Sequence, residues 1–448
     1  MTLTRTGYLV PDIPDVKREL TVRPIVNGDF GIAPPSFKVF RHSKSGLCVP
    51  RYYGEEKFGP PGDDNRPMPA KMNVAFGGKL RDETFQNEAL RKAVEAGHGI
   101  LSLPCGYGKT TVSLAIACKL GYRTMIVVHK EFLANQWKER IQQFCPGATI
   151  GTVQRDKKEV DCDFVIAMLQ SLSLKEYSFS DFDSVGTLVV DEAHHVCAKV
   201  FSQSLFKLCA RHTFGLSATP ERKDGLTKVL HWFMGPTFFA VERENQAQVN
   251  VFIIDFKCKR FGDTPPCTRF GKLSMPTMIT ELTEMRDRNS TIVSTIKSIT
   301  RMKPGISPRQ VLVLSDRRQH CEWLHSQFED HSGLYMGGMK EKDLVKSSAK
   351  QIIFATFSQA HEGLDIPSLD TVILATPKSD IVQSIGRIMR ETPGKKNSPR
   401  IYDIVDHWSV FFTMFQKRLK VYKQGGFKIP NVHEEPDDFT SGKCIIQV

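Results

Sequence analysis

Residues 101–111 read Leu101-Ser102-Leu103-Pro104-Cys105-Gly106-Tyr107-Gly108-Lys109-Thr110-Thr111. The apolar run at 99–103 predicts a buried strand, the glycines predict a turn, and residues 112–120 have helical periodicity. This order is the context of a phosphate-binding loop, because backbone N–H groups of the turn and the helix start can point at phosphate oxygens. Lys109 would reach the β- and γ-phosphates, and Thr110 would hold Mg²⁺. The strict G-x-x-x-x-G-K-[ST] spacing is not met, since Leu103 stands at the first glycine position. A surface glycine turn beside a helix is the alternative.

The chain has 448 residues, of which 40% are hydrophobic and 25% are charged, values typical of globular proteins. This length predicts about two to four domains. Lysine and arginine number 61 against 49 for aspartate and glutamate, so the formal net charge is +12. This excess favours an acidic partner, most commonly nucleic acid, and a generally basic protein without such a partner is the alternative.

The 11 cysteines are scattered and include no C-x-x-C pair, which argues against a structural zinc site and a disulfide framework. We therefore expect a reducing, intracellular compartment. Residues 1–20 lack an apolar signal core, and no run of about 18 apolar residues occurs, so we expect no membrane partner.

Residues 1–75 are predicted to be a small β-rich accessory domain, with short β-like runs at 37–40 and 47–53. Their basic and aromatic side chains would suit phosphate contacts combined with base stacking, or would equally pack this domain on the next. These side chains are Lys38, Phe40, Arg41, Lys44, Arg51, Tyr52, Tyr53, Lys57 and Phe58.

From residue 76 onwards, strands alternate with helices, which predicts an α/β fold of parallel sheets with helices on both faces. Within residues 76–244 we expect strands at 100–103, 124–128, 164–167, 187–190 and 214–217, and helices that include 131–144 and 196–209.

A second alternation occupies residues 245–425. It opens with an apolar run at 249–254, and further strands are expected at 310–314, 351–355, 371–375 and 401–405. Helices are expected at 278–300, 317–328, 381–390 and 410–423. Basic and aromatic residues at 256–272 could form a nucleic-acid-facing hairpin or a solvated connection. Residues 426–448 are predicted to be a mostly disordered tail, and a partner-binding tail is the alternative.

Residues 187–195 read Thr187-Leu188-Val189-Val190-Asp191-Glu192-Ala193-His194-His195. A strand that ends in two acidic residues can place Asp191 on Mg²⁺ and Glu192 beside a water that attacks the γ-phosphate. An acidic helix start is the alternative, and Lys109 in the same predicted domain weakens it.

Two further segments carry polar residues that could take part in nucleotide hydrolysis. Ser217-Ala218-Thr219-Pro220 ends another predicted strand and could hydrogen-bond to the acidic residues. Residues 383–390 read Gln383-Ser384-Ile385-Gly386-Arg387-Ile388-Met389-Arg390, and Arg387 and Arg390 share one helix face with Gln383. Two arginines suit the charge that develops on a γ-phosphate during transfer, and a solvated basic face is the alternative.

Together these stretches resemble the superfamily 2 helicases, the DEAD/DEAH-like group with two tandem RecA-like domains. The resemblance covers residues 78–425, with the family's motifs in the expected order. They are motif I at 104–110, Ia at 128–130 with Gln136-Trp137, Ib at 168–172, II (the DEAH box) at 191–194, III at 217–219, IV at 312–315, V at 355–357 with 362–365, and VI at 383–390. The resemblance implies that motif Ia, including Trp137, contacts the nucleic-acid backbone.

Residues 216–226, the double histidine of motif II and the Pro104-Cys105 pair of motif I further resemble the XPB/UvsW branch, which acts on DNA. The short chain and residues 49–53 resemble helicases of large nucleocytoplasmic DNA viruses, of the poxvirus transcript-release type. The XPB/UvsW branch usually carries Leu-Arg-x-x-Gln before motif I, and this glutamine reads the adenine base. In this sequence the spacing between Leu80-Arg81 and Gln86 is two residues longer than in that pattern. Gln86 is therefore the candidate adenine reader.

The resemblance implies an ATP-dependent DNA helicase that uses Mg²⁺ and binds ATP between two RecA-like domains. Catalysis would rest on Lys109, Asp191, Glu192, Arg387 and Arg390, with coupling through Ser217, Ala218 and Thr219. Further ATP contacts would come from Gln86, Pro104, Cys105, Gly106, Tyr107, Gly108, Thr110, Thr111, Gly363, Asp365 and Gln383.

Several other functions would use the same residues. The protein could be a duplex translocase that does not unwind, an ATP-gated nucleic-acid-binding scaffold, or an enzyme whose main substrate is RNA. Expected partners are single-stranded, duplex or forked DNA, with RNA polymerase or nascent RNA as further candidates. In a virus, the protein would act at the replication or transcription site of the host cell and could enter the virion.

Overall fold

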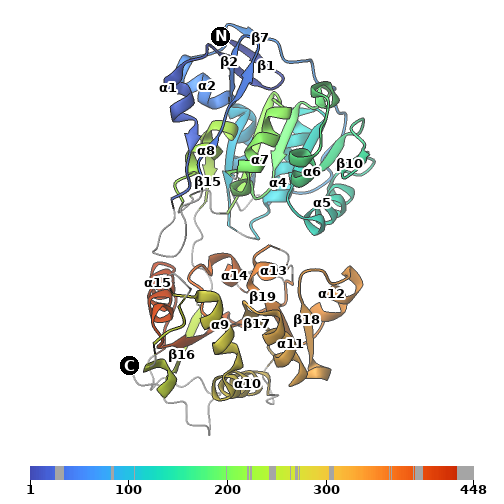
Figure 1. Ribbon diagram of the computed structural model, residues 1–448. Coiled ribbons are helices and arrows are strands. Elements are labelled where there is room, and N and C mark those ends of the chain that lie inside the picture. The colour runs from blue at the N-terminus through green and yellow to red at the C-terminus, as the bar shows by residue number, and fades with distance from the viewer. Residues whose placement is uncertain are drawn as a thin grey trace. The chain divides into compact units, whose positions relative to one another are not determined.

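The computed structural model describes residues 1–25, 35–81, 85–104, 106–197, 199–218, 221, 224–241, 249–262, 264–267, 271, 273–301, 307–362, 364, 366–386, 388 and 397–430. The chain forms two compact units, Met1–Arg243 and Glu244–Val448. Each unit contains a large, mainly parallel sheet with helices on both faces, so the predicted tandem α/β architecture is confirmed (Figure 1). No helix in the described ranges has the length and apolar character needed to cross a bilayer.

The large sheet of the first unit has eight strands in the order β11-β10-β12-β9-β13-β14-β8-β15. All neighbours pair in parallel except β10 and β11, which form an antiparallel pair. The strands are β8 (His98–Ser102), β9 (Thr124–Val128), β10 (Ile150–Gln154), β11 (Lys157–Lys158), β12 (Phe164–Met168), β13 (Thr187–Val190), β14 (His212–Ser217) and β15 (Thr237–Ala240).

The inner strands β9, β12 and β13 are almost entirely apolar because both faces of this sheet are buried. Successive side chains alternate between the two cores, so Ile100 joins one cluster and Leu101 joins the other. Helices α3 (Gln86–Ala96), α4 (Lys109–Leu120) and α5 (Glu131–Phe144) cover one face. Helices α6 (Leu169–Leu174) and α8 (Thr227–Met234) help cover the other, together with the N-terminal region.

The predicted helix at 196–209 is wrong as a single element. The chain forms a 3₁₀ turn at Ala193–Cys197, the short helix α7 (Lys199–Ser204) and a second 3₁₀ turn at Leu205–Lys207. Cys197, Leu205 and Phe206 all reach the same core from these short turns. Burial of these side chains therefore needs no continuous helix.

The N-terminal region forms a five-stranded sheet in the order β5-β6-β2-β1-β7, with a separate β3–β4 pair. Its elements are β1 (Thr2–Thr4), β2 (Gly7–Val10), α1 (Pro14–Glu19), β3 (Thr21–Val22), β4 (Phe37–Lys38), β5 (Arg41–Ser43), β6 (Gly46–Val49), α2 (Arg51–Phe58) and β7 (Asp63–Asp64). The β-like run predicted at 47–53 is therefore wrong beyond Val49. Pro50 precedes α2 with a φ of −54°, and Arg51 pairs with Glu55 one turn later, so both favour a helix start here.

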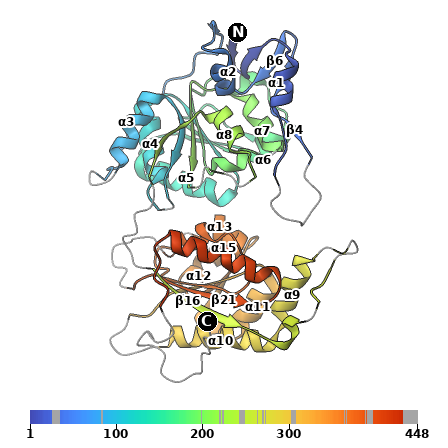
Figure 2. The ribbon, with the colours of Figure 1, turned by 90° about the vertical axis from the view of Figure 1, so that its left-hand side faces the viewer.

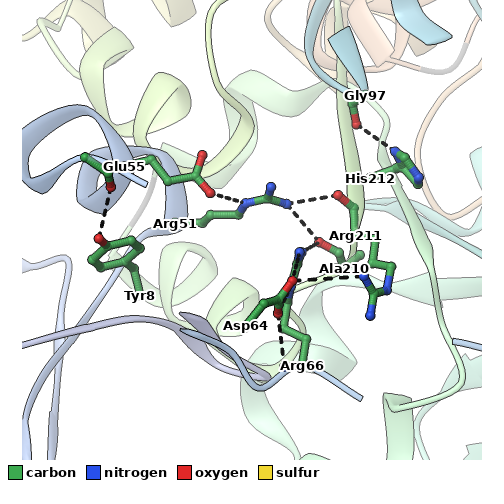
Figure 3. Close-up of polar contacts among 10 residues, drawn as sticks. Tyr8, Arg51, Glu55, Asp64, Arg66, Gly97, Ala210, Arg211 and His212 are labelled. Carbon is green, nitrogen blue, oxygen red and sulfur yellow. Dashed lines mark hydrogen bonds and ion pairs between the residues drawn. The ribbon is translucent and has the colours of Figure 1, made fainter. Parts of the chain in front are cut away.

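Two arginines attach this region to the first large sheet (Figure 3). Arg51 donates to the carbonyl oxygens of Ala210 (3.3 Å) and Arg211 (2.9 Å). Arg66 donates to the same Ala210 oxygen at 2.8 Å and also pairs with Asp64. The Arg66 guanidinium lowers the pKa of Asp64 to about 2.

The aromatic residues of this region pack inward. Phe40, Tyr52 and Tyr53 are 5%, 6% and 2% exposed, so their rings are not available for stacking on bases. Arg41 donates to the Gln203 side chain and backbone. Of the two roles considered for these residues, packing on the adjacent sheet is the one that the geometry supports.

The sheet of the second unit is fully parallel, with six strands in the order β16-β21-β20-β17-β19-β18. Helix α15 lies on one side of β16 and β21, and α10 lies on the other (Figure 2). The strands are β16 (Asn250–Phe256), β17 (Val311–Ser315), β18 (Ser332–Tyr335), β19 (Ile352–Thr356), β20 (Thr371–Leu374) and β21 (Arg400–Asp406). The helices are α9 (Met275–Glu284), α10 (Arg286–Thr300), α11 (Arg318–Ser326), α12 (Glu341–Ser348), α13 (Phe357–Glu362), α14 (Val382–Gly386) and α15 (Val410–Gln424).

Two sequence expectations change in this unit. The helix predicted at 278–300 is interrupted at Met285, whose backbone is extended, and the Asn289 side chain donates to the Thr283 carbonyl beside the break. The tail predicted at 426–448 begins in an ordered way, because Lys428 exchanges backbone hydrogen bonds with Val249 and Val251. Residues 431–448 lie outside the described ranges.

Two buried ion pairs hold strand β21 and the chain that follows β20. Arg288, from α10, binds both oxygens of Asp406 and donates to the Ala375 carbonyl. Arg418, from α15, binds both oxygens of Asp403 and donates to the Lys378 carbonyl. Both arginines are at most 1% exposed. The two arginines lie on opposite faces of the sheet, and both hold the segment between β20 and α14 through its carbonyl groups.

We predict that Arg418→Met destabilises the second unit by about 3–5 kcal/mol, because it leaves the Asp403 carboxylate buried without its cation. Urea unfolding of the full chain, followed by circular dichroism, measures the shift. Arg91→Met is the matched control, since the Arg91–Glu95 pair is 60% exposed on both sides and should change stability negligibly. Equal shifts in the two variants would contradict the role of this buried pair.

Candidate nucleotide site

The phosphate-binding loop connects β8 to α4. Gly106 and Gly108 have φ values of +87° and +82°, in the left-handed region that favours glycine. Gly108 is also the residue before α4, so the free N–H groups of the helix start face the loop. A Cβ atom at Gly108 would lie 2.6 Å from the Gln86 amide nitrogen. The second glycine therefore serves both the turn and a close approach by Gln86.

Lys109 directs its ammonium group into this loop. Its Nζ donates to the backbone oxygen of Leu103 at 2.8 Å and lies 3.5 Å from that of Pro104. Thr110 and Thr111 follow in the first turn of α4 and are partly exposed. Cys105 lies outside the described residues.

Gln86 lies directly against the loop despite its unusual spacing from Leu80-Arg81. It is 6% exposed, its Nε2 donates to the Tyr107 carbonyl (3.2 Å), and its Oε1 accepts from the Arg81 N–H (3.0 Å). Phe85 stacks on Tyr107 with 5.6 Å between ring centroids. Gln86 is thus positioned beside the nucleotide loop, and its reading of adenine stays a prediction.

Asp191 follows β13 and is oriented at both carboxylate oxygens. Oδ1 accepts from the Glu192 N–H and Oδ2 accepts from the Trp137 indole N–H, each at 2.9 Å. Burial, followed by the charge of Glu192, raises the pKa of Asp191 to about 6, and the Trp137 hydrogen bond and Lys109 oppose that rise. Glu192 itself has a φ of +45°, a conformation that is rare for a side chain of this size.

His194 connects the acidic residues to the next strand end. Its Nδ1 lies 3.4 Å from the Ser217 hydroxyl and 3.5 Å from a Glu192 oxygen. Ala193 is buried and Ala218 is partly exposed, whereas Thr219 lies outside the described residues. The strand order thus brings the ends of β13 and β14 together beside the loop after β8.

Sequence reasoning placed Trp137 at a nucleic-acid contact, and the structure places it elsewhere. Trp137 is 2% exposed and packs in the core between α5 and the sheet, with its N–H on Asp191. The two residues are 54 positions apart, so no local pattern in the sequence reveals this contact.

The candidate residues of the second unit are only partly described. Gln383 lies in α14, and nothing is described of its side chain. Gly363, Asp365, Arg387 and Arg390 lie outside the described residues. Their neighbours Leu364, Ile366, Ile385 and Ile388 are all at most 5% exposed. Described residues adjacent to Gly363, Asp365 and Arg387 are therefore anchored in the core.

The residues of the first unit fit a nucleotide with Mg²⁺. A hard divalent cation prefers carboxylate and hydroxyl oxygens, which Asp191 and Thr110 provide. The partly buried Asp191 carboxylate has a raised pKa, so a nearby cation would favour its charged form. Lys109 and the N–H groups at the start of α4 suit the phosphates.

Comparison with known proteins shows the family to which the chain belongs. Residues 79–222 match the family model described as "Type III restriction enzyme, res subunit". The chain is 33% identical over 434 residues to a "Putative ATP-dependent RNA helicase" of Acanthamoeba polyphaga mimivirus, covering 90% of this chain and 81% of that protein. It is 31% identical over 396 residues to a "Putative helicase" of Invertebrate iridescent virus 6, covering 80% and 84%. A "Putative ATP-dependent RNA helicase" of African swine fever virus is 24% identical over 378 residues, covering 78% and 73%.

Among solved structures, the fold is similar to that of the ATP-dependent Type ISP restriction-modification enzyme LlaBIII bound to DNA. The TM-score is 0.53 and the identity is 18%, and the match covers 77% of this chain and 30% of that enzyme.

The chain belongs to the superfamily 2 helicases, which confirms the predicted family. Within that class its relatives include the named putative helicases of mimivirus, iridescent virus and African swine fever virus. It is therefore an ATP-dependent enzyme of the helicase class, which uses ATP with Mg²⁺.

We predict that Gln86→Ala reduces discrimination between ATP and GTP, because the side chain that lies on the loop would no longer be available to read the base. The measurement is the ratio of kcat/KM for the two nucleotides, which should fall by about tenfold or more. Gln143→Ala, an exposed glutamine on α5, is the control and should leave the ratio unchanged. An unaltered ratio in Gln86→Ala would contradict a role in reading adenine and would leave Gln86 as a support of the phosphate-binding loop.

Proposed function

We propose that the protein couples ATP hydrolysis to movement along DNA. The observation that supports this most is the row of strand ends at one edge of the first sheet. In sheet order β12, β9, β13, β14 and β8 run in parallel, and they are followed by the motifs Ib, Ia, II, III and I. Proposed nucleic-acid contacts and proposed nucleotide contacts therefore lie side by side on one rigid edge.

Contacts along this edge provide a physical connection between the two kinds of residue. The Gln170 amide donates to the His129 carbonyl at 2.6 Å. The His129 ring lies 4.0 Å from the His195 ring, which in turn lies 4.4 Å from the His194 ring. Displacement of motif Ia by a bound strand would therefore shift the histidine rings of motif II.

In the proposed reaction, Lys109 and the start of α4 bind the triphosphate, and Thr110 and Asp191 hold Mg²⁺. When bound, the metal would supply positive charge that stabilises the phosphate oxygens during transfer. Glu192 orients the attacking water and accepts its proton. Arg387 and Arg390 are proposed to stabilise the charge that develops on the γ-phosphate.

DNA is proposed as the substrate because residues 216–226 resemble the DNA-acting XPB/UvsW branch and the net charge is +12. RNA is the second candidate, favoured by the names of the mimivirus and African swine fever virus relatives. A viral transcription or replication site in the host cell, with RNA polymerase or nascent RNA as a further partner, is proposed as the setting.

The substrate is tested by measuring ATP hydrolysis in parallel with single-stranded DNA, duplex DNA, forked DNA and RNA at one stated salt concentration, since backbone binding depends strongly on salt. We expect DNA to stimulate turnover more than RNA does. A strand-displacement assay and a triplex-displacement assay then separate unwinding from translocation without unwinding. Stimulation by RNA alone would overturn the DNA proposal.

We predict that Lys109→Ala and Arg390→Ala each lower nucleic-acid-stimulated kcat by about a thousandfold, because each removes a cation from the reacting phosphates. Lys119→Ala, exposed on the same helix as Lys109, and Arg301→Ala, exposed in the second unit, are the matched controls. Full stimulated hydrolysis in either test variant would contradict the proposed site. Intact binding without turnover in the wild-type protein would instead favour an ATP-gated scaffold.

A further inference from the structure

Trp137 belongs to the segment that resembles motif Ia, for which a nucleic-acid contact is expected, yet its side chain is buried. It lies on α5 and is 2% exposed, and its ring packs among the buried side chains between helices α3–α5 and the sheet. Its indole N–H points at Oδ2 of Asp191, 2.9 Å away. The indole is therefore inside the first unit, beside the carboxylate proposed to hold Mg²⁺.

The hydrogen bond has a direct consequence for the shape of the site. A tryptophan has one polar atom, and a buried N–H requires an acceptor to avoid a large desolvation cost. Asp191 already accepts from the Glu192 N–H at its other oxygen. With one donor on each oxygen, the plane of the carboxylate is set from two directions.

Helix α5 also starts at a fixed place on the sheet edge. It begins at Glu131, directly after His129 and Lys130, which follow strand β9. His129 is held by Gln170 through its carbonyl and by His195 through its ring. The start of the helix that carries Trp137 is therefore held to both neighbouring motifs.

We propose that Trp137 is a positioning residue that orients the Asp191 carboxylate for Mg²⁺ and so sets the metal affinity of the nucleotide site. This inference rests on the proposed assignment of Asp191 to the metal. Groups that orient a metal ligand by hydrogen bonding typically change metal affinity about 10- to 100-fold when they are removed. A role in packing alone would not produce that effect.

The test is Trp137→Phe in the full chain, which keeps an aromatic ring and removes the donor. Binding of a fluorescent ADP analogue is titrated with Mg²⁺, and the same binding is measured in EDTA. We expect the apparent Mg²⁺ affinity to fall by about tenfold. Nucleotide binding in EDTA should stay unchanged, because Lys109 and the loop are intact.

Trp408→Phe is the matched control. Trp408 is also 2% exposed, and its indole nitrogen has no hydrogen-bond partner within the described part of the chain. Its replacement should leave the Mg²⁺ titration unchanged. A wild-type titration in Trp137→Phe would overturn the inference.

Asp191→Asn distinguishes failure of this inference from failure of the proposed site. If Asp191→Asn weakens Mg²⁺ binding and Trp137→Phe does not, only the role of Trp137 is wrong. If Asp191→Asn also titrates like the wild type, the metal assignment itself is wrong and the inference falls with it.

A second measurement applies if Trp137→Phe does not fold. The sequence has four tryptophans, so replacement of Trp232, Trp323 and Trp408 one at a time by phenylalanine identifies the Trp137 indole signal in ¹⁵N–¹H NMR by elimination. We expect that signal to shift when Mg²⁺ is added to the ADP-bound wild-type protein. A signal that does not move on saturation with Mg²⁺ would overturn the inference.

Discussion

Burial of both faces of a parallel sheet is the constraint on which the first unit depends. Parallel strands need long crossovers, whose helices cover both faces of the sheet, and the carboxyl ends of the parallel strands all lie at the same edge. Residues that follow β8, β13 and β14 therefore meet although they are far apart in the sequence. The site needs no special loop to gather Lys109, Asp191 and Ser217, because the sheet order already places them in neighbouring positions.

Charge is concentrated on that edge under partly desolvated conditions. Asp191 and Glu192 are adjacent, and burial together with their mutual repulsion opposes ionisation of Asp191. Lys109 faces backbone oxygens and also stabilises the charged form of Asp191. The arrangement suits a ligand that brings both anionic phosphates and a divalent cation. The phosphates complement the charge of Lys109, and the cation complements the charges of Asp191 and Glu192.

Much of the fold could be predicted where local signals were strong. Strand β9, helix α5 and strand β13 match the predicted ranges because uninterrupted apolar runs and a clear helical period define them. Strands β10 and β18 were not predicted, since runs such as Ile150–Gln154 and Ser332–Tyr335 become strands only by pairing with neighbours. The motif residues could be named from their order in the sequence, but the contact between Trp137 and Asp191 could not. It depends on the distance between a helix and a strand, which no spacing in the sequence encodes.

The way the N-terminal region meets the first sheet affects how the chain can be divided. Side chains such as Leu3, Tyr8 and Val10 share one continuous core with sheet residues such as Ile100 and Val127. Arg51 and Arg66 meanwhile supply donors to carbonyl groups at Ala210 and Arg211. A fragment that starts at residue 76 would expose an apolar sheet face to water and leave those carbonyls without their donors. The unit that contains the phosphate-binding loop thus folds together with its first strands. Shortening the protein to its motifs would produce an aggregation-prone fragment and not a minimal ATPase.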